Sequence, residues 1–183
     1  MKKYFQKPRC KDLNKTEGFA LIELSLVIAL MIMVTMLAVQ GFSFYQRLIL
    51  HAELDKLYTF FLATARKAAV DNQTYTIRFD APQHSYTTRN AHNTTTYKLP
   101  EGVIFGLLPG IYGPPAQPKA AVRSPVTFEK QQTIFYADGR IQPGTVYITD
   151  AKKQWQYSLS VPVGTISYIR RYRYQHKKWE LVA

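Results

Sequence analysis

The chain has 183 residues, of which 46% are hydrophobic and 14% aromatic. This length suits one ordinary domain with an appended segment, and the apolar content excludes an intrinsically disordered chain. The formal net charge is +12, which favours contact with anionic surfaces or nucleic acid. The single cysteine is Cys10, so the chain beyond it has no thiol for a disulfide or a thiolate metal site.

Residues 1–18 form a basic leader that ends at Gly18. The leader contains six basic and two acidic residues, so it holds +4 of the net charge and the rest of the chain holds +8. An excess of Lys and Arg before an apolar segment predicts a cytoplasmic N-terminus.

An uncharged stretch follows at residues 24–46. It is 23 residues long, which corresponds to about 35 Å of helix, enough to span a bilayer. We therefore expect a hydrophobic transmembrane helix over residues 19–46, with the remainder of the chain across the membrane. Glu23 lies near the start of this helix. A carboxylate at mid-bilayer costs roughly 2.5–3.5 kcal/mol, so a charge placed there is usually functional.

The helical pattern continues past the expected membrane edge. Residues 47–71 carry an amphipathic stripe at three- and four-residue spacing, made of Leu50, Leu54, Leu57, Phe61, Ala65 and Ala68. Asp71 and Asn72 predict the end of the helix, because short polar side chains compete for the backbone. One helix over residues 19–70 would be on the order of 80 Å long.

From residue 72 to residue 183 the pattern changes to the alternation of strands. Residues 74–79 and 84–88 predict two strands joined by a turn, and Asp138-Gly139 predicts a hairpin turn. A loop rich in proline and glycine is expected over residues 109–118. Further short strands are predicted at residues 133–136, 144–149, 154–161 and 165–174. A long helix followed by antiparallel strands predicts an α+β fold.

The segment Gly18-Phe19-Ala20-Leu21-Ile22-Glu23-Leu24 resembles the prepilin motif (class III signal) of type IV pilins and type II secretion pseudopilins. In that family a prepilin peptidase cuts after the glycine and methylates the new N-terminal residue. The resemblance implies cleavage between Gly18 and Phe19, N-methylation of Phe19, and Glu23 as the fifth mature residue. Ala20 departs from the more common Thr, at a permissive position.

The physical chemistry of this segment agrees with a role in assembly. After cleavage Phe19 carries a positive amine, and an unpaired charge in an apolar medium costs several kcal/mol. Glu23 of one subunit can neutralise the amine of a neighbour, which registers adjacent helices. The alternative is that Glu23 only lies among the lipid headgroups. An ordinary secretory signal is a further alternative, but residues 38–40 (Ala-Val-Gln) are a poor cleavage site.

Later segments resemble minor pilins of the GspH/FimT type. The similar segments are Ala65–Ala69, Ile134–Arg140 and Gly164–Ile166, together with the strands at residues 144–149 and 157–161. This resemblance implies two small antiparallel sheets packed on the helix.

The function implied is that of a minor pilin or pseudopilin in a type II secretion, type IV pilus or DNA-uptake machine. The subunit would lie in the bacterial inner membrane with its globular domain periplasmic, and would enter the filament on assembly. Its partners would be prepilin peptidase, other pilin or pseudopilin subunits, an inner-membrane assembly platform and membrane lipid. No enzymatic activity, cofactor or metal is expected, since the four histidines are scattered and no phosphate-binding glycine loop is present. A monomeric membrane-anchored domain is a weaker alternative.

The C-terminal tail suggests a second function, because cations alternate there with aromatic residues. Cations neutralise phosphates and aromatic rings stack on bases, so the pattern suits single-stranded nucleic acid. DNA-uptake pilins of the FimT type are similar in having a basic C-terminal segment, although their Gly-Arg-x-Arg motif is absent here. The candidate DNA-binding residues are Arg170, Arg171, Arg173, Lys177, Lys178, Tyr172 and Tyr174. The alternative is an ordinary final strand with solvated charges.

Overall fold

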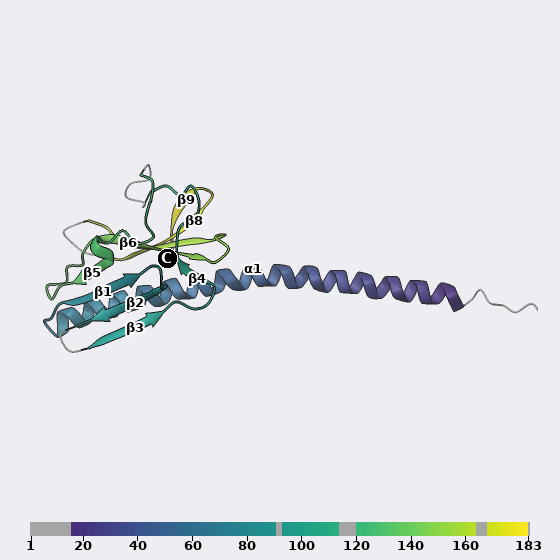
Figure 1. The fold of residues 1–183 in the computed structure, drawn as a ribbon, viewed down its shortest axis with the longest axis horizontal. Coiled ribbons are helices and arrows are strands. Elements are labelled where there is room, and N and C mark those ends of the chain that lie inside the picture. The colour runs from purple at the N-terminus through teal and green to yellow at the C-terminus, as the bar shows by residue number, and fades with distance from the viewer. Residues whose placement is uncertain (1–15, 91–92, 114–119, 164–167, 183) are drawn as a thin grey trace, which may run out of the picture. The chain divides into compact units, whose positions relative to one another are not determined.

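The computed structural model of the chain describes residues 16–90, 93–113, 120–163 and 168–182. Within the helix, the side chains of residues 16–20 and 38–43 lie outside this description. The chain divides into two units, Met1–Ser43 and Phe44–Ala183. Helix α1 (Thr16–Val70) contains residues of both units, and every described strand belongs to the second (Figure 1).

The second unit contains two antiparallel sheets. The first has four strands in the order β3-β2-β1-β5, with bounds Thr94–Lys98, Ser85–Arg89, Tyr75–Asp80 and Gln132–Phe135. The second has five strands in the order β4-β6-β7-β8-β9, with bounds Val103–Phe105, Gly144–Asp150, Gln156–Val161, Arg170–Gln175 and Lys178–Val182. A short 3-10 helix, η1 (Glu129–Gln131), precedes β5. The predicted α+β fold with two antiparallel sheets is confirmed.

Strand β1 illustrates how the sequence specifies the first sheet. Its apolar residues Tyr75, Ile77 and Phe79 are buried, whereas Thr76 and Arg78 between them are at least partly exposed. Successive side chains of a strand point to opposite faces, so this alternation gives the sheet one apolar and one polar face.

The second half of α1 supplies the other side of the core. Leu50, Leu54, Leu57 and Phe61 recur at helical spacing and are completely buried. The ring of Phe61 meets that of Phe135 on β5 edge to face, with the ring centroids 5.3 Å apart. Burial of this stripe, more than helix propensity, holds the helix on the domain.

A buried glutamine on β7 fixes the segment that follows β4. The Gln156 amide nitrogen donates to the carbonyls of Gly106 (3.1 Å) and Ile148 (2.9 Å), and its oxygen accepts from the Leu108 N–H (2.8 Å). Because buried polar groups are stable only when paired, these bonds hold residues 106–108 in place. The start of the loop at Pro109 is thereby positioned.

One carboxylate lies in the buried part of α1. Glu53 is 5% exposed, and its Oε2 is 3.4 Å from Lys56 Nζ. Its Oε1 has no hydrogen-bond partner among the described residues. Burial raises the pKa of Glu53 above its ordinary value, and the charge of Lys56 only partly opposes this.

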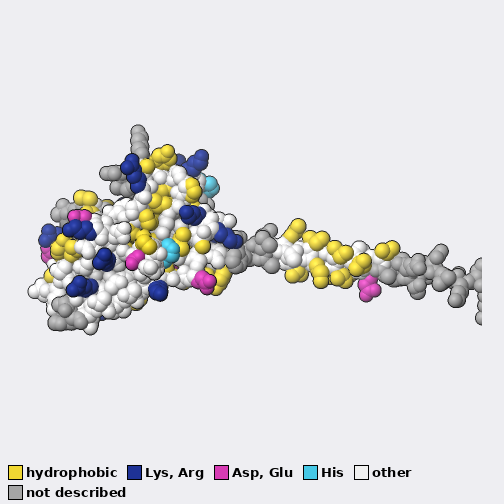
Figure 2. Space-filling model, in the orientation of Figure 1, with side chains coloured by type: hydrophobic (Ala, Val, Ile, Leu, Met, Phe, Trp, Pro, Cys, Tyr) yellow, Lys and Arg dark blue, Asp and Glu magenta, His cyan; other side chains and the backbone are white. Residues whose placement is uncertain are grey.

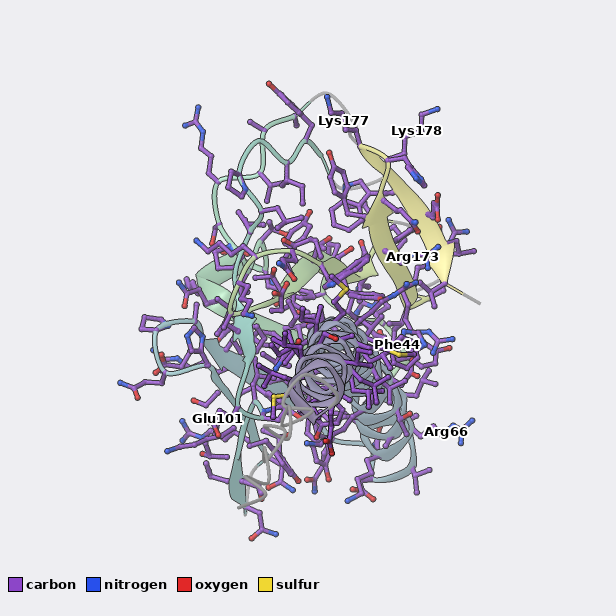
Figure 3. The ribbon with its side chains drawn as sticks, turned by 90° about the vertical axis from the view of Figure 1, so that its right-hand side faces the viewer. Phe44, Arg66, Glu101, Arg173, Lys177 and Lys178 are labelled. Carbon is purple, nitrogen blue, oxygen red and sulfur yellow. The ribbon has the colours of Figure 1, made fainter. Side chains whose placement is uncertain are left out.

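Replacing Glu53 with glutamine is expected to stabilise the domain at neutral pH. An acid whose pKa is higher in the folded state binds its proton more tightly there, so stability is lost as pH rises from the unfolded pKa through the folded pKa. Glu53→Gln carries no charge and escapes this loss. Its advantage over the wild type in urea unfolding should grow as the pH rises above the ordinary pKa of a glutamate. Glu101→Gln, on the exposed surface (Figure 3), is the control and should give no such gain; an equal gain from both variants would contradict the role of burial.

Candidate functional site

The helix of the first unit presents an apolar surface to its surroundings. Every side chain from residue 21 to residue 37 is exposed, including Leu24, Ile28 and Met31. Figure 2 shows hydrophobic side chains along the visible face of this segment. The Ser25 and Thr35 hydroxyls donate to backbone carbonyls of the same helix, at 2.8 Å to Ile22 and 2.9 Å to Met31. The two hydroxyl groups are thus satisfied internally, and the surface stays apolar.

The predicted processing residues lie at the start of this helix. Gly18 and Phe19 belong to α1, but the side chain of Phe19 lies outside the description. Residues 1–15 of the leader also lie outside the described residues. Glu23 is exposed, and its carboxylate has no ion-pair partner among the residues that the structure describes. It is the one charged residue between positions 21 and 37. Within the described part of the chain, no helix combines the length and the apolar character required to cross a membrane.

The predicted DNA-binding residues form a hairpin and do not share one face. Strands β8 and β9 pair antiparallel, with Arg173 opposite Glu180 and Tyr174 opposite Trp179. Alternation along β8 separates Arg171 and Arg173 from Arg170, Tyr172 and Tyr174. The seven candidates are therefore divided between two faces and the turn.

Two of the three arginines are engaged within the domain. Arg173 donates to Glu180 at 2.8 Å. Arg171 donates to Asp55 on α1 at 2.5 Å, and its guanidinium lies 4.5 Å from the centre of the Tyr58 ring. Exposed ion pairs contribute little, but Arg171 is only 19% exposed and its bond joins the last hairpin to the helix.

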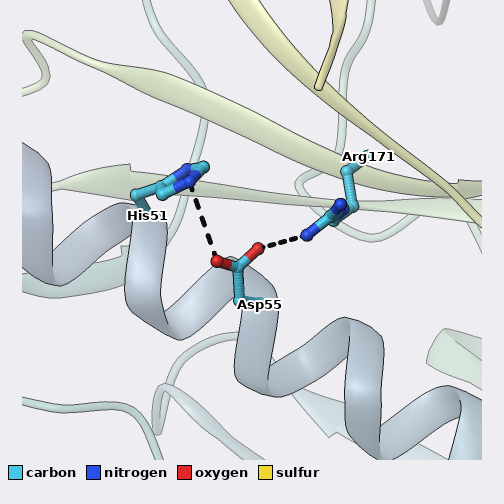
Figure 4. Close-up of polar contacts among 3 residues, drawn as sticks. All are labelled: His51, Asp55 and Arg171. Atoms are coloured by element: carbon cyan, nitrogen blue, oxygen red, sulfur yellow. Dashed lines mark hydrogen bonds and ion pairs between the residues drawn. The ribbon is translucent and has the colours of Figure 1, made fainter. Parts of the chain in front are cut away.

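The Arg171 pair extends into a chain of three residues (Figure 4). Asp55 accepts from Arg171 through Oδ1, and its Oδ2 lies 3.7 Å from His51 Nε2. The His51 ring lies 5.7 Å from the ring of Tyr157 on β7. These contacts fasten α1 to two strands of the second sheet, which is a structural use of Arg171.

On the opposite face, Arg170 lies against aromatic side chains. Its guanidinium is 4.5 Å from the centre of the Tyr168 ring. A hydrogen bond with Tyr172 raises the pKa of Arg170 above its ordinary value. This arginine therefore keeps its charge and remains at the surface.

The remaining cations border an aromatic cleft. Lys177 lies in the hairpin turn and Lys178 begins β9; both are exposed and lie at the far end of the hairpin from Arg173 (Figure 3). The cleft measures about 550 Å³, and its lining includes both lysines with Tyr112, Tyr174 and Trp179.

The indole ring of Trp179 is held in place within the cleft. The Trp179 indole N–H donates to the Tyr112 carbonyl at 3.1 Å, and its ring lies 5.1 Å from that of Tyr174 and 5.6 Å from that of buried Tyr147. Neither lysine has a salt-bridge partner in the described part of the chain. Sequence reasoning did not predict Tyr112, because it lies in the expected Pro/Gly loop and 67 residues from Trp179.

Over the described residues, no group of three or more His, Cys, Asp or Glu side chains is placed to hold a metal ion.

No family model matches the sequence, and no curated protein matches it either. The solved structures that are similar include two of the minor pseudopilin EpsH from the type II secretion system of Vibrio cholerae. One has 16% identity and a TM-score of 0.46, covering 67% of this chain and 94% of that chain. The other has 17% identity and a TM-score of 0.42, covering 74% of this chain and 94% of that chain.

Proposed function

We propose that the chain is a minor pilin or pseudopilin subunit of a bacterial filament. One observation carries this proposal: a basic leader that ends in glycine is followed by a helical segment, residues 21–37, whose exposed side chains are almost all apolar. The exceptions are Glu23 and the hydroxyls of Ser25 and Thr35, which donate to carbonyls of their own helix. A helix that is apolar all round requires lipid or other helices around it. Lipid would surround the helix while the subunit is in the membrane, and the helices of neighbouring subunits would surround it in the filament.

In this proposal the subunit is held in the inner membrane by residues 19–46, with the N-terminus cytoplasmic and the β domain periplasmic. Prepilin peptidase removes the leader after Gly18 and methylates Phe19. The Phe19 amine then pairs with Glu23 of an adjacent subunit. The partners are the peptidase, lipid, other pilin or pseudopilin subunits and an inner-membrane assembly platform, and the activity is structural rather than enzymatic.

Mass spectrometry of the purified protein tests the processing step. We expect a mature N-terminus at Phe19 carrying one methyl group, because the residues around position 18 match the motif of the peptidase. Gly18→Val is the matched control and should accumulate with its leader intact, since the cut requires glycine. An intact Met1 terminus on the wild type, in cells that contain a prepilin peptidase, would contradict the proposal.

A second candidate function, binding of single-stranded DNA, is favoured by the aromatic cleft. Tyr112 is 59% exposed, and Lys177 and Lys178 lie beside it with no salt bridge in the described part of the chain. Arg171 and Arg173 are less suited than the sequence predicts, because both already pair with carboxylates. Binding would therefore depend on the hairpin turn and the exposed tyrosine.

A salt-varied gel shift of the full chain in detergent, with oligo(dT) as the probe, tests this function. We expect Tyr112→Ala to weaken binding by roughly 10-fold, because stacking contributes about 1–3 kcal/mol per base. Lys177→Gln with Lys178→Gln should weaken it and reduce the salt dependence. Arg66→Gln, on the outer side of α1 (Figure 3), is the control. No binding at low salt, or equal losses in all variants, would exclude the cleft as a DNA site.

A further inference from the structure

The outer face of the first sheet is largely polar, with Ile134 at its β5 edge as an apolar member. The strand register places Thr96, Thr87, Arg78 and Gln132 in one row across the four strands. The next row contains Thr94, Arg89, Thr76 and Ile134. All of these side chains are at least partly exposed, whereas the alternate residues Ile77 and Phe79 face the core.

This face is hollowed. The hollow measures about 1110 Å³ and is lined largely by hydroxyl, amide and guanidinium groups, with Phe79 and Pro82 as the apolar contributions. Thr87 and Thr96 hydrogen-bond to each other across β2 and β3 at 3.0 Å. A surface of short hydroxyl side chains fixed on strands is rigid, so it loses little conformational entropy when a ligand binds.

The charge of the hollow is positive and is not neutralised. Arg78 and Arg89 are exposed, and neither has an ion-pair or hydrogen-bond partner among the described residues. They are diagonal neighbours on paired strands, about 7–8 Å apart at the backbone. The one carboxylate in the lining, Asp80, accepts from the Gln83 N–H at 3.0 Å. Two free guanidinium groups in a concave surface attract anions and bind carboxylates in a bidentate geometry.

We propose that this hollow binds an acidic polysaccharide whose sugars carry carboxylates. The hydroxyl and amide groups match the many hydroxyls of such a chain, and the two arginines match carboxylates spaced along it. Nucleic acid suits the hollow less well, because its phosphates are dense and the lining offers no exposed aromatic ring on which bases could stack. A second copy of the chain is disfavoured as the occupant, because the chain beyond the leader carries a net charge of +8 and the hollow already contains two arginines against one carboxylate. This binding is independent of the proposed filament role.

Affinity electrophoresis of the full chain in detergent, with polygalacturonate in the gel, tests the proposal. We expect retardation that is absent in neutral dextran and that weakens at least about 10-fold in the double variant Arg78→Gln/Arg89→Gln, which removes two charge-assisted contacts. The double variant Arg66→Gln/Arg123→Gln removes the same net charge from exposed positions outside the hollow and should bind as the wild type does. Thr96→Val keeps the charge and should weaken binding to a smaller extent.

Three results would overturn the proposal. The first is absence of retardation by polygalacturonate. The second is an equal loss in the two double variants, which would make the attraction a matter of net charge alone. The third is tighter binding of oligo(dT) than of polygalacturonate with the same dependence on Arg78 and Arg89, which would make the hollow a nucleic-acid site. Circular dichroism of each variant checks that the sheet is intact.

Discussion

Replacing Glu23 with alanine is expected to reduce filament assembly by at least about tenfold while leaving membrane insertion and leader cleavage intact. Among the charges of the chain, Glu23 is the one exposed between residues 21 and 37, and its removal makes that segment more apolar. Insertion is therefore not impaired. Under the proposed function, assembly should suffer because the amine of each incoming Phe19 would lose its carboxylate partner, and an unpaired charge in an apolar medium costs several kcal/mol.

The measurement is the ratio of sheared filament to membrane-held subunit, with the mature mass determined in parallel. Ser25→Ala is the matched control, because the Ser25 hydroxyl bonds only to its own helix. Glu23→Gln keeps the size of the side chain and should fail as Glu23→Ala does. Normal assembly of a cleaved, methylated Glu23→Ala subunit would show that the carboxylate has no part in registering neighbours.

Replacing Phe61 with alanine is expected to lower the free energy of unfolding of the second unit by about 3–5 kcal/mol. Phe61 is completely buried, and its ring lies 5.3 Å from Phe135, 6.2 Å from Phe79 and 6.3 Å from Phe128. Truncation leaves a cavity among three rings held by two strands and a loop, so the surroundings cannot collapse to fill it. A loss of this size is a large part of the stability of an ordinary domain.

Urea unfolding followed by the fluorescence of Trp155 and Trp179 measures the loss. Phe44→Ala is the control, because the Phe44 side chain is 67% exposed and should cost less than about 1 kcal/mol. Similar urea midpoints for the two variants would mean that the aromatic cluster around Phe61 does not stabilise the core.

Strand β1 of the first sheet was predictable because it alternates between apolar and polar residues. In β1, Ile77 and Phe79 flank Arg78, and the turn after Asp80 is rich in turn-forming residues. The last hairpin was not predicted as two strands. Its turn is made by His176 and Lys177, which adopt positive φ values of 51° and 60° without glycine or asparagine. Such a turn lacks the usual sequence signal.

The connection between the two sheets could not be predicted from local sequence patterns either. The turn at Asp138-Gly139 forms as expected, with Gly139 at a φ of 83°. The chain then leaves the first sheet, and β6 pairs with β4 and β7. Gly144 marks the crossing, because an added Cβ would lie 2.3 Å from the Phe128 ring. Pairing between distant strands depends on packing of this kind, which no short window of sequence reveals.

The sequence indicated which cationic and aromatic residues could bind a ligand, but not which of them already form contacts within the domain. The alternation of cations and aromatics in the tail indicated Lys177 and Lys178, and both are exposed in the structure. It could not show that Arg171 pairs with Asp55, 116 residues away along the chain. Charge patterns report which residues are available, whereas the fold decides which of them are already occupied.

The bond between Asp55 and Arg171 also bears on the order of folding. The helix is synthesised first, but the strand that binds Asp55 is among the last parts of the chain to emerge. Contacts of such large sequence separation slow folding, because the intervening loop must close before they form. The contact between Asp55 and Arg171 therefore forms only after β8 has been synthesised. A truncated chain lacking β8 and β9 would leave Asp55 without Arg171 and would remove the guanidinium that lies 4.5 Å from the Tyr58 ring, so this side of α1 would be exposed to solvent.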